Sequence, residues 1–472
     1  MDAMHNNKIT SKQLVELYLQ RIDQVNLKGP SLHALIETNP DALTIAHRLD
    51  HERNRRGKLH GIPIIVKDNM ATYDKLNTTA GSYALLGSKV SRDAFVVQQL
   101  RKAGAIILGK ASLSEWSNFR SLVVPRNGVS GRGGVSKSAY VTDGDPSGSS
   151  SGSAIAVSIG LCTVALGTET DGSVVAPASR NGIVGLKPTV GLTSRSNVIP
   201  ISFRQDTVGP MGKTVTDVAL LLEVIQGVDP RDNATLKSRP EKTYTQFLRG
   251  TKGFKNVRLG VIPPFNFTNK TAPYIVSTFN KAIELMCSYG AIVQNPVNFT
   301  NMDQLLNSTT ELDVLIAEFR QNINNYLSTL TNTKMHTLQD LINFNNAHKD
   351  LEFSPYLPDQ QLFILSQEAP PLSIEREAEY IRLSKSLNQT MDIYNLDALV
   401  AMSEDYASLA AVGGYPIISV PLGYLQTAGG PQPFGIQFMG RAWSEGILLQ
   451  LAHAFEQATH VRDKVRPIYA PS

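Results

Sequence analysis

DPSGSSSGSAIAVSIGLCTVALGTETDGSVVAPASRNGIVGLKP, residues 145–188, is the stretch that decides the fold of this chain. Seven of the eight residues at 147–154 are Gly or Ser, an apolar segment follows, and a second turn of small residues lies at 170–173. Small residues let the backbone approach a ligand closely and present bare N–H groups. Because a flexible Gly/Ser linker would lack the apolar segments, the pattern favours two serine-bearing turns of a catalytic site.

The composition is that of a large globular protein. The chain has 472 residues, of which 42% are hydrophobic and 18% charged, and its length allows one large or two ordinary domains. The net charge of +4 is small and unclustered, so nucleic-acid binding is not indicated. The two cysteines, Cys162 and Cys287, cannot form a disulfide framework. No run of eighteen apolar residues exists, so no membrane span is predicted.

The chain contains seven Asn-x-Ser/Thr glycosylation acceptors, and the sequence allows two cellular locations, cytoplasmic or secreted. The chain starts with polar residues and shows no signal peptide, which favours the cytoplasm. The acceptors, most of them after residue 230, would suit a secreted glycoprotein whose leader is missing from this sequence. They lie at Asn77, Asn233, Asn266, Asn269, Asn298, Asn307 and Asn388.

Apolar segments of strand and helix character alternate along the chain, which predicts an α/β fold. Such alternation is typical of a mixed or parallel sheet covered by helices on both faces. Helices are predicted at 11–24, 41–56, 93–103, 112–119, 214–226, 272–289, 311–330, 337–348, 374–394 and 444–459. Strands are predicted at 61–66, 105–108, 183–186, 257–261, 398–401, 417–421 and 434–438. The central stretch adds a helix and a strand before the turn at 170–173.

Two kinds of base could activate a serine in these turns. Ser150 lies in a G-x-S-x-G segment, which would make it a nucleophile-elbow serine served by His453 or His460. That motif requires a strand immediately before it, whereas residues 141–146 are turn-like. The other candidate is Lys67, which ends an apolar strand and would act as a base if burial kept it neutral. Its alternative role is a solvated lysine paired with Asp68.

Five motifs follow one another in order along the chain. They are GIPIIVKD at 61–68, PSGSSSGS at 146–153, GTETDGS at 167–173, GIVGLKPT at 182–189 and DTVGP at 206–210. Together they resemble the amidase signature family, and the resemblance extends from residue 9 to residue 443. The segment EWSNFR at 115–120, together with ETDGS at 169–173, is most similar to the peptide amidase branch.

The resemblance implies a Ser-Ser-Lys triad and an acyl-enzyme intermediate, without metal or organic cofactor. Ser173 would be the nucleophile, Ser149 the bridging serine after a cis peptide bond, and Lys67 the base. The 24 residues from 149 to 173 (173 − 149) fit the family spacing and select Ser149 over Ser150. The backbone N–H groups of Thr170, Asp171, Gly172 and Ser173 would form the oxyanion hole.

Several residues near the expected pocket differ from the family pattern. Val175 replaces the arginine of the amidotransferase branch, whereas Asp171 is shared with the peptide amidase branch. Val129, Val135 and Phe203 are also unusual. We therefore expect Val129, Val175 and Phe203 to contact the substrate, a small-molecule or peptide amide without a charged carboxylate.

The sequence as a whole predicts a single amidase signature domain, residues 1–472. Core motifs occupy 61–215, a helix-rich insertion about 229–395, and C-terminal strands and a helix 396–472. The expected assembly is a monomer or a homodimer. Two alternatives stay open: a glutamine-using amidotransferase subunit and a non-catalytic relative that binds amides.

Overall fold

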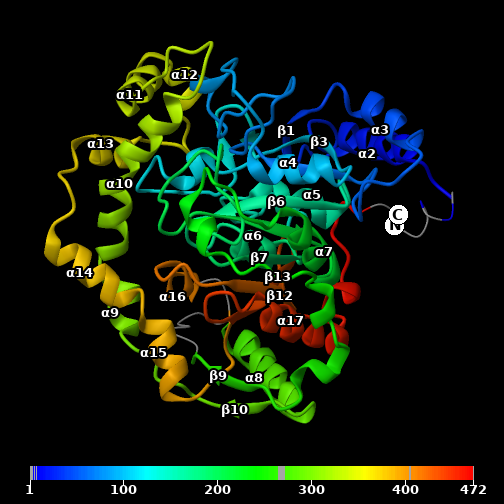
Figure 1. Ribbon diagram of the computed structural model, residues 1–472, viewed down its shortest axis with the longest axis vertical. Helices are drawn as coiled ribbons and strands as arrows, with labels where there is room; N and C mark the ends of the chain where they lie inside the picture. The colour runs from blue at the N-terminus through cyan, green and yellow to red at the C-terminus, as the bar shows by residue number, and fades with distance from the viewer. Residues whose placement is uncertain (1–3, 5, 7, 264–271, 403–405, 471–472) are drawn as a thin grey trace.

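A single twisted sheet runs through the whole structure (Figure 1). The computed structural model describes every residue except 1–3, 5, 7, 264–271, 403–405 and 471–472. Within the described residues, eleven strands are arranged in the order β1-β3-β2-β6-β8-β7-β12-β13-β11-β9-β10. They are β1 Leu35–Thr38, β2 Pro63–Lys67, β3 Ile106–Ala111, β6 Val164–Glu169, β7 Val184–Lys187, β8 Thr207–Gly212, β9 Arg258–Val261, β10 Ile292–Gln294, β11 Ala398–Met402, β12 Ile417–Thr427 and β13 Gly430–Met439.

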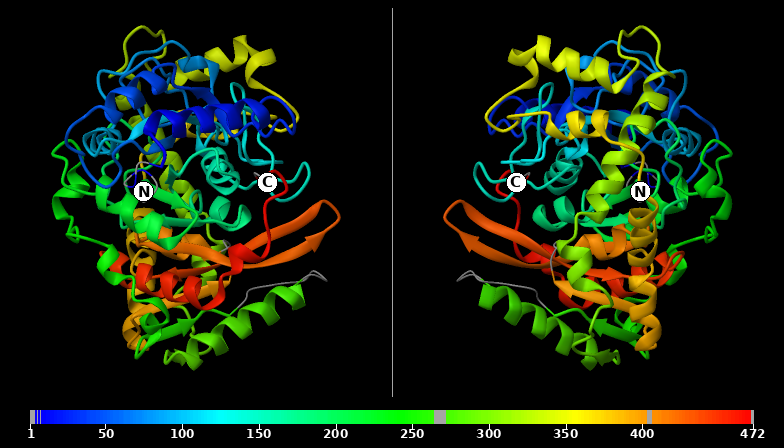
Figure 2. Two further views of the ribbon diagram at one scale, coloured as in Figure 1. Left: turned by 90° about the vertical axis from the view of Figure 1, so that its right-hand side faces the viewer. Right: turned by 90° about the vertical axis from the view of Figure 1, so that its left-hand side faces the viewer.

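The sheet is mixed, with parallel pairs near both ends and antiparallel pairs in the middle. Strands β3, β2 and β6 are parallel, as are β11, β9 and β10. The strands from β6 to β11 pair antiparallel through β8, β7, β12 and β13. Figure 2 shows the long hairpin of β12 and β13 extending away from the body of the molecule. A separate two-stranded ladder joins β4 Val129–Ser130 to β5 Gly134–Val135.

Helices cover both faces of the sheet, as the sequence predicts. Ile64 and Val66 of β2 pack in one apolar cluster with α4 and α7, whereas Ile65 packs in another with α2 and α5. This alternation follows from the two-residue period of a strand. The described helices are α2 Ser11–Val25, α3 Ala42–Asp50, α4 Phe95–Lys102, α5 Ser151–Ile159, α6 Val175–Arg180, α7 Val215–Ile225, α8 Ala272–Ser288, α9 Met302–Asn307, α10 Thr310–Leu327, α11 Leu338–Ala347, α12 Lys349–Glu352, α13 Gln361–Glu368, α14 Ile374–Leu383, α15 Ser386–Ile393, α16 Ala407–Ala411 and α17 Glu445–Thr459.

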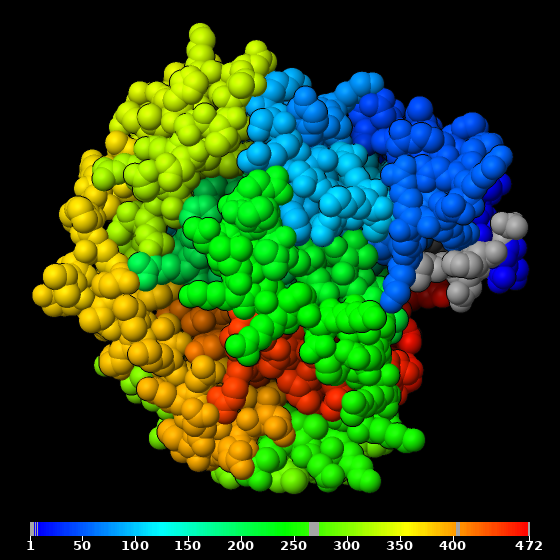
Figure 3. Space-filling model, viewed as in Figure 1, coloured from blue at the N-terminus to red at the C-terminus, as the bar shows by residue number. Residues whose placement is uncertain are grey.

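Helices from the later half of the chain form a wall on the earlier half. Phe319 of α10 and Phe363 of α13 stack on each other and contact Phe119 and Trp116, respectively. In Figure 3 the yellow-green surface of these helices adjoins the blue and cyan surface of the N-terminal third. Segments far apart in the sequence are therefore packed together here.

The helix and strand limits differ from the predicted ones at a few places. The helix predicted at 41–56 ends at Asp50, whose carboxylate accepts hydrogen bonds from the N–H groups of Ser11 and Lys12 at the start of α2. The helix predicted at 374–394 is broken into α14 and α15. Strand β8 was not predicted because its sequence TVGPMG carries Gly and Pro, which are poor strand formers.

Strands of all three predicted parts of the chain share the one sheet, and the division at about 229 and 396 remains a prediction. Among the described helices, none has the length and apolarity needed to cross a membrane. Of the glycosylation acceptors, Asn233, Asn298 and Asn307 are exposed, and Asn77 and Asn388 are partly buried. Asn266 and Asn269 lie outside the described residues.

Candidate active site

Lys67 is the last residue of β2, and its side chain is completely buried. Its ammonium nitrogen Nζ lies 2.7 Å from Ser149 Oγ, 3.1 Å from Ser150 Oγ and 3.1 Å from the carbonyl oxygen of Thr168. The parallel strands β2 and β6 place Lys67 beside Thr168, because both residues lie at the carboxyl end of their strand. The solvated role that the sequence left open for Lys67 is therefore wrong.

Burial lowers the pKa of Lys67 to about 7, far below the value of an exposed lysine. Desolvation is the dominant cause, because it penalises the charged ammonium form. The carboxyl groups of Glu169 and Asp206 act in the opposite direction but do not offset it. At neutral pH a substantial fraction of Lys67 is therefore unprotonated and able to accept a proton.

The two serines beside Lys67 lie where the Gly/Ser segment enters α5. The peptide bond between Gly148 and Ser149 is cis, as the family resemblance implies. Ser150 is also bound to β6: its hydroxyl donates to the Thr168 carbonyl at 3.1 Å and accepts from the Thr168 N–H at 3.2 Å. Its own N–H donates to the carbonyl oxygen of Ser173 at 3.1 Å, which ties the two small-residue turns together.

The turn at 170–173 connects β6 to α6 and presents its backbone N–H groups. Gly172 has φ +73°, a conformation that glycine adopts at little cost. The N–H groups of Asp171, Gly172 and Ser173 donate to no other described residue. The two N–H groups that follow, at Val174 and Val175, both donate to the carboxylate of Glu169. Glu169 thus anchors the turn at its C-terminal end, while the three N–H groups of Asp171, Gly172 and Ser173 remain available as hydrogen-bond donors.

Ser173 is the most exposed member of the triad predicted from the resemblance. Its exposed fraction is 8%, whereas Lys67 and Ser149 are fully buried. The described residues include no hydrogen-bond partner for Ser173 Oγ, and it is not hydrogen-bonded to Ser149 Oγ. The structure thus joins Lys67 to Ser149 directly and brings Ser173 beside them through the backbone contact of Ser150.

Three lysines are fully buried among the described residues, and of these Lys67 is the one that contacts serine hydroxyls. Lys110 donates to the carbonyl oxygen of Met70 and to Thr78 Oγ1. Lys187 donates to the carbonyl oxygens of Pro188 and Tyr415. Burial lowers the pKa of both lysines to about 8, but their partners give them structural roles.

The histidines of the nucleophile-elbow alternative lie elsewhere. His453 Nδ1 accepts a hydrogen bond from the N–H of Gly250, and His460 is exposed near Asp463. Ser150 has neither as a partner, and no strand immediately precedes it. The arrangement does not support a Ser-His pair on Ser150.

The three residues expected to contact substrate are not brought into one cavity. Val175 is fully buried in an apolar cluster with Ile262 and Tyr406. Val129 is buried and pairs with Val135 in the ladder of β4 and β5. Phe203 is 46% exposed and lines a cavity of about 590 Å³ that also includes Arg195 and Tyr326.

Residues that sequence reasoning did not single out surround the turn at 170–173. Glu169 accepts the two N–H groups already described, and Asp171 Oδ2 accepts a hydrogen bond from Ser408 Oγ at 2.6 Å. Glu311 of α10 lies nearby, and burial together with Asp171 raises its pKa to about 8. Glu169 could have been noticed from its motif, whereas nothing near Glu311 in the sequence indicates its position.

Comparisons with known proteins identify the family and the fold of this chain. The family model described as Amidase matches residues 13–399. A probable amidase of Arabidopsis thaliana is 44% identical over 475 residues, covering 98% of this chain and 89% of that protein. The X-ray structure of native peptide amidase from Stenotrophomonas maltophilia has a TM-score of 0.92 and 39% identity, covering 100% of this chain and 97% of that chain.

An amidase family protein from Bacillus anthracis is also similar, with a TM-score of 0.89 and 33% identity over 98% of this chain and 90% of that chain. These matches confirm the fold and the family resemblance predicted from the sequence. This chain therefore belongs to the amidase signature family and is a hydrolase that acts on amide carbon–nitrogen bonds.

Proposed function

We propose that this enzyme hydrolyses amides through a triad in which Ser173 is the nucleophile, Ser149 the bridge and Lys67 the base. Neutral Lys67 accepts a proton from Ser149, Ser149 accepts one from Ser173, and the oxygen of Ser173 attacks the amide carbonyl carbon. The protons return along the same path to the departing nitrogen, which leaves as ammonia or an amine. Water then hydrolyses the acyl-enzyme ester and releases the acid.

The observation that carries this proposal is the 2.7 Å contact between Lys67 Nζ and Ser149 Oγ in a fully buried site. A lysine that contacts a serine in this way can exchange a proton with it only if the amine is partly neutral. The lowered pKa of Lys67 meets that requirement.

The turn at 170–173 supplies the charge stabilisation that the reaction needs. A tetrahedral intermediate on Ser173 carries negative charge on the former carbonyl oxygen. The free N–H groups of Asp171, Gly172 and Ser173 are available as its donors, and the family resemblance adds that of Thr170. Each such donor contributes about 3–4 kcal/mol to stabilising the transition state in serine hydrolases.

We expect kcat/KM to rise with pH and to level off above about pH 7. Protonated Lys67 cannot accept a proton, so activity falls about tenfold per unit below its pKa of about 7. Between pH 5 and pH 8 the increase should therefore be on the order of a hundredfold. A pH–rate profile with an amidated dipeptide measures it, with circular dichroism confirming the fold at each pH.

Glu311 also titrates near neutral pH and serves as the control for this profile. The variant Glu311→Gln keeps a hydrogen-bond acceptor for Gln205 and should retain the rise with pH. A profile that is flat from pH 5 to pH 8 in the unmodified enzyme would rule out Lys67 as the base.

We further propose that the substrates are uncharged amides, such as C-terminally amidated peptides or apolar amides. Val175 follows Ser173 by two residues and is buried, and the family resemblance implies an arginine at this position in the amidotransferase branch. The adjacent turn carries the acidic Asp171 instead of a cation. A substrate carboxylate would therefore gain no ion pair here. The similarity to peptide amidase supports the same choice of substrate.

Free glutamine should accordingly be a poor substrate compared with an amidated hydrophobic dipeptide. A charge-assisted hydrogen bond is worth about 1.5–3 kcal/mol, so its absence predicts a kcat/KM ratio of roughly 10- to 100-fold. Ammonia release from both compounds gives the ratio. Glutamine methyl ester, which has no free carboxylate, is the matched control and should release ammonia faster than glutamine does. Equal or better turnover of glutamine would contradict the proposal.

A further inference from the structure

Thr170, the first residue of the turn, is held at two points by the adjacent pair Gln205 and Asp206. Its hydroxyl donates to Asp206 Oδ1 at 2.7 Å. Its carbonyl oxygen accepts a hydrogen bond from Gln205 Nε2 at 3.3 Å. The turn at 170–173 is thus fixed at its start by side chains from another segment of the chain.

The carboxylate of Asp206 is itself fixed by the backbone of its own loop. Its second oxygen, Oδ2, accepts from the N–H groups of Ile201 at 2.7 Å and Ser202 at 3.1 Å. Both oxygens are therefore occupied, and the carboxylate cannot rotate without losing a hydrogen bond to Thr170 or to the loop.

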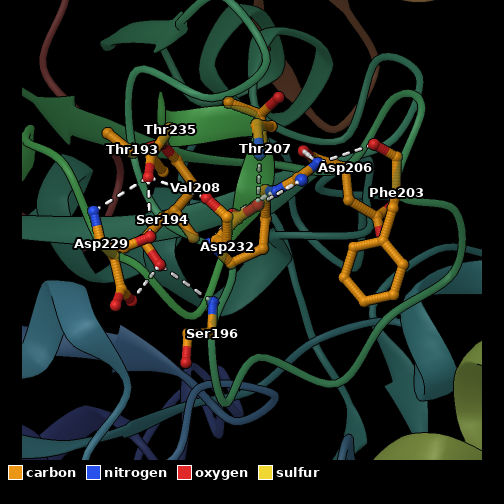
Figure 4. Close-up of polar contacts among 12 residues, drawn as sticks. Thr193, Ser194, Ser196, Phe203, Asp206, Thr207, Val208, Asp229, Asp232 and Thr235 are labelled. Carbon is orange, nitrogen blue, oxygen red and sulfur yellow. Dashed lines mark hydrogen bonds and ion pairs between the residues drawn. The ribbon is translucent and has the colours of Figure 1, made fainter. Parts of the chain in front are cut away.

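Arg195 fixes the loop at 203–206 through hydrogen bonds to two of its carbonyl oxygens. Its Nη1 donates to the carbonyl oxygens of Phe203 at 2.8 Å and Asp206 at 3.2 Å. Its Nε and Nη2 donate to the two carboxylate oxygens of Asp232 at 2.6 and 2.7 Å. Figure 4 shows Phe203, Asp206 and Asp232 with the polar contacts of this region. The Phe203 ring also lies 5.3 Å from the guanidinium carbon. A planar guanidinium is suited to join two segments in this way.

We infer that Asp206, held by Arg195, is a positioning residue that orients the backbone donors of the turn through Thr170. This inference rests on the proposed oxyanion role of residues 170–173. The N–H groups of Asp171, Gly172 and Ser173 have no partner among the described residues, so their direction depends on where Thr170 is fixed. Misplacement of a catalytic group by about 1 Å can cost a hundredfold in rate.

The test compares Thr170→Val, which removes the hydroxyl at nearly constant volume, with Thr170→Ser, which keeps it. We expect Thr170→Val to lower kcat about 10- to 100-fold with KM changed less than about threefold, because the donors act mainly on the transition state. Thr170→Ser, which keeps the hydroxyl, should retain most of the kcat of the unmodified enzyme. A kcat for Thr170→Val within about twofold of the unmodified enzyme would overturn the inference.

Thr193→Val is the matched control for a general loss of stability. Thr193 is fully buried, and its hydroxyl donates to the carbonyl oxygen of Val208 at 2.8 Å, but it does not contact the turn. Both Thr→Val variants should have similarly lowered melting temperatures, and kcat should fall strongly in Thr170→Val alone. Equal losses of kcat in the two variants would show a structural effect only and overturn the inference.

Inhibition by a trifluoromethyl ketone, which adds to the reactive serine, separates a positioning role of Asp206 from a purely structural one. Its adduct places an oxyanion in the turn, so Thr170→Val should weaken its inhibition at least tenfold while leaving a non-reactive competing amide unaffected. Arg195→Lys, which cannot bridge Asp232 and both carbonyl groups, should weaken ketone inhibition in the same direction. Equal weakening for both inhibitors would contradict the inference.

Failure of this inference can be told apart from failure of the proposed function. If Ser173→Ala remains active, the proposed nucleophile is wrong, whatever Thr170→Val does. If Ser173→Ala is inactive and Thr170→Val has normal kcat and normal ketone inhibition, the triad stands and the positioning role of Asp206 is refuted.

Discussion

Ser173→Ala is expected to lose amide hydrolysis by a factor of at least about 10⁴, because the proposed mechanism forms the acyl-enzyme on the hydroxyl of Ser173. Ser173 lies at the end of the turn whose N–H groups are free, and its hydroxyl has no hydrogen-bond partner among the described residues. Removing that hydroxyl should therefore leave the fold and the melting temperature nearly unchanged. Initial rates with an amidated dipeptide and a thermal melt measure both effects.

A matched serine on the neighbouring helix controls for the substitution itself. Ser158 of α5 is buried, and its hydroxyl donates to the carbonyl oxygen of Asn181 at 2.8 Å, away from Lys67. Ser158→Ala should remain active. A serine-directed fluorophosphonate should label the unmodified enzyme and Ser158→Ala, but not Ser173→Ala. Labelling of Ser173→Ala at full stoichiometry would assign the nucleophile to another residue.

Ser149→Ala and Lys67→Met should each reduce kcat/KM by about 10³-fold or more, and the double variant should be little worse than the poorer single variant. Non-additive effects are expected because Lys67, in the proposed triad, acts on Ser173 only through Ser149, so either loss interrupts the same proton path. Methionine retains much of the buried volume of Lys67 without its charge. The rates of both single variants and the double variant form the measurement.

Ser150→Ala is the comparison that identifies the bridging serine. Lys67 contacts Ser150 at 3.1 Å, but the hydroxyl of Ser150 is already engaged with the backbone of Thr168. Its loss should therefore cost stability more than activity. If Ser150→Ala proved as inactive as Ser173→Ala while Ser149→Ala stayed active, the bridge would be Ser150.

The central elements of the fold could be predicted from the sequence because their signals are local. Alternating helix and strand patterns identified β2, β3 and α2, and the helix predicted at 214–226 is α7. Strands β1, β4, β5, β8 and β10 were missed. β8 contains Gly and Pro, and β10 is only three residues at the edge of the sheet.

In the candidate site, too, the residues in local motifs could be predicted, whereas those brought in from distant helices could not. Lys67, Ser149 and Ser173 were found from motifs, since each lies in a short segment of distinctive residues. Glu311 and Tyr380 reach Gln205 from α10 and α14, more than a hundred residues downstream, and no local pattern indicates such a contact. For Val175, the sequence revealed an unusual residue but not its environment, because its complete burial depends on packing against distant residues.

The strand order of the sheet has a consequence for how the chain is made. Strand β7 pairs on one side with β12, whose first residue, Ile417, follows Lys187 by 230 positions (417 − 187). At ribosomal rates of about 5–20 residues per second, the nascent chain carries β7 without that partner for roughly 10–50 s. An unpaired strand edge of this kind is prone to associate with other chains. Premature termination before β12 would leave the edge open permanently, so truncated products should precipitate even though they contain Lys67, Ser149 and Ser173, the residues of the proposed triad.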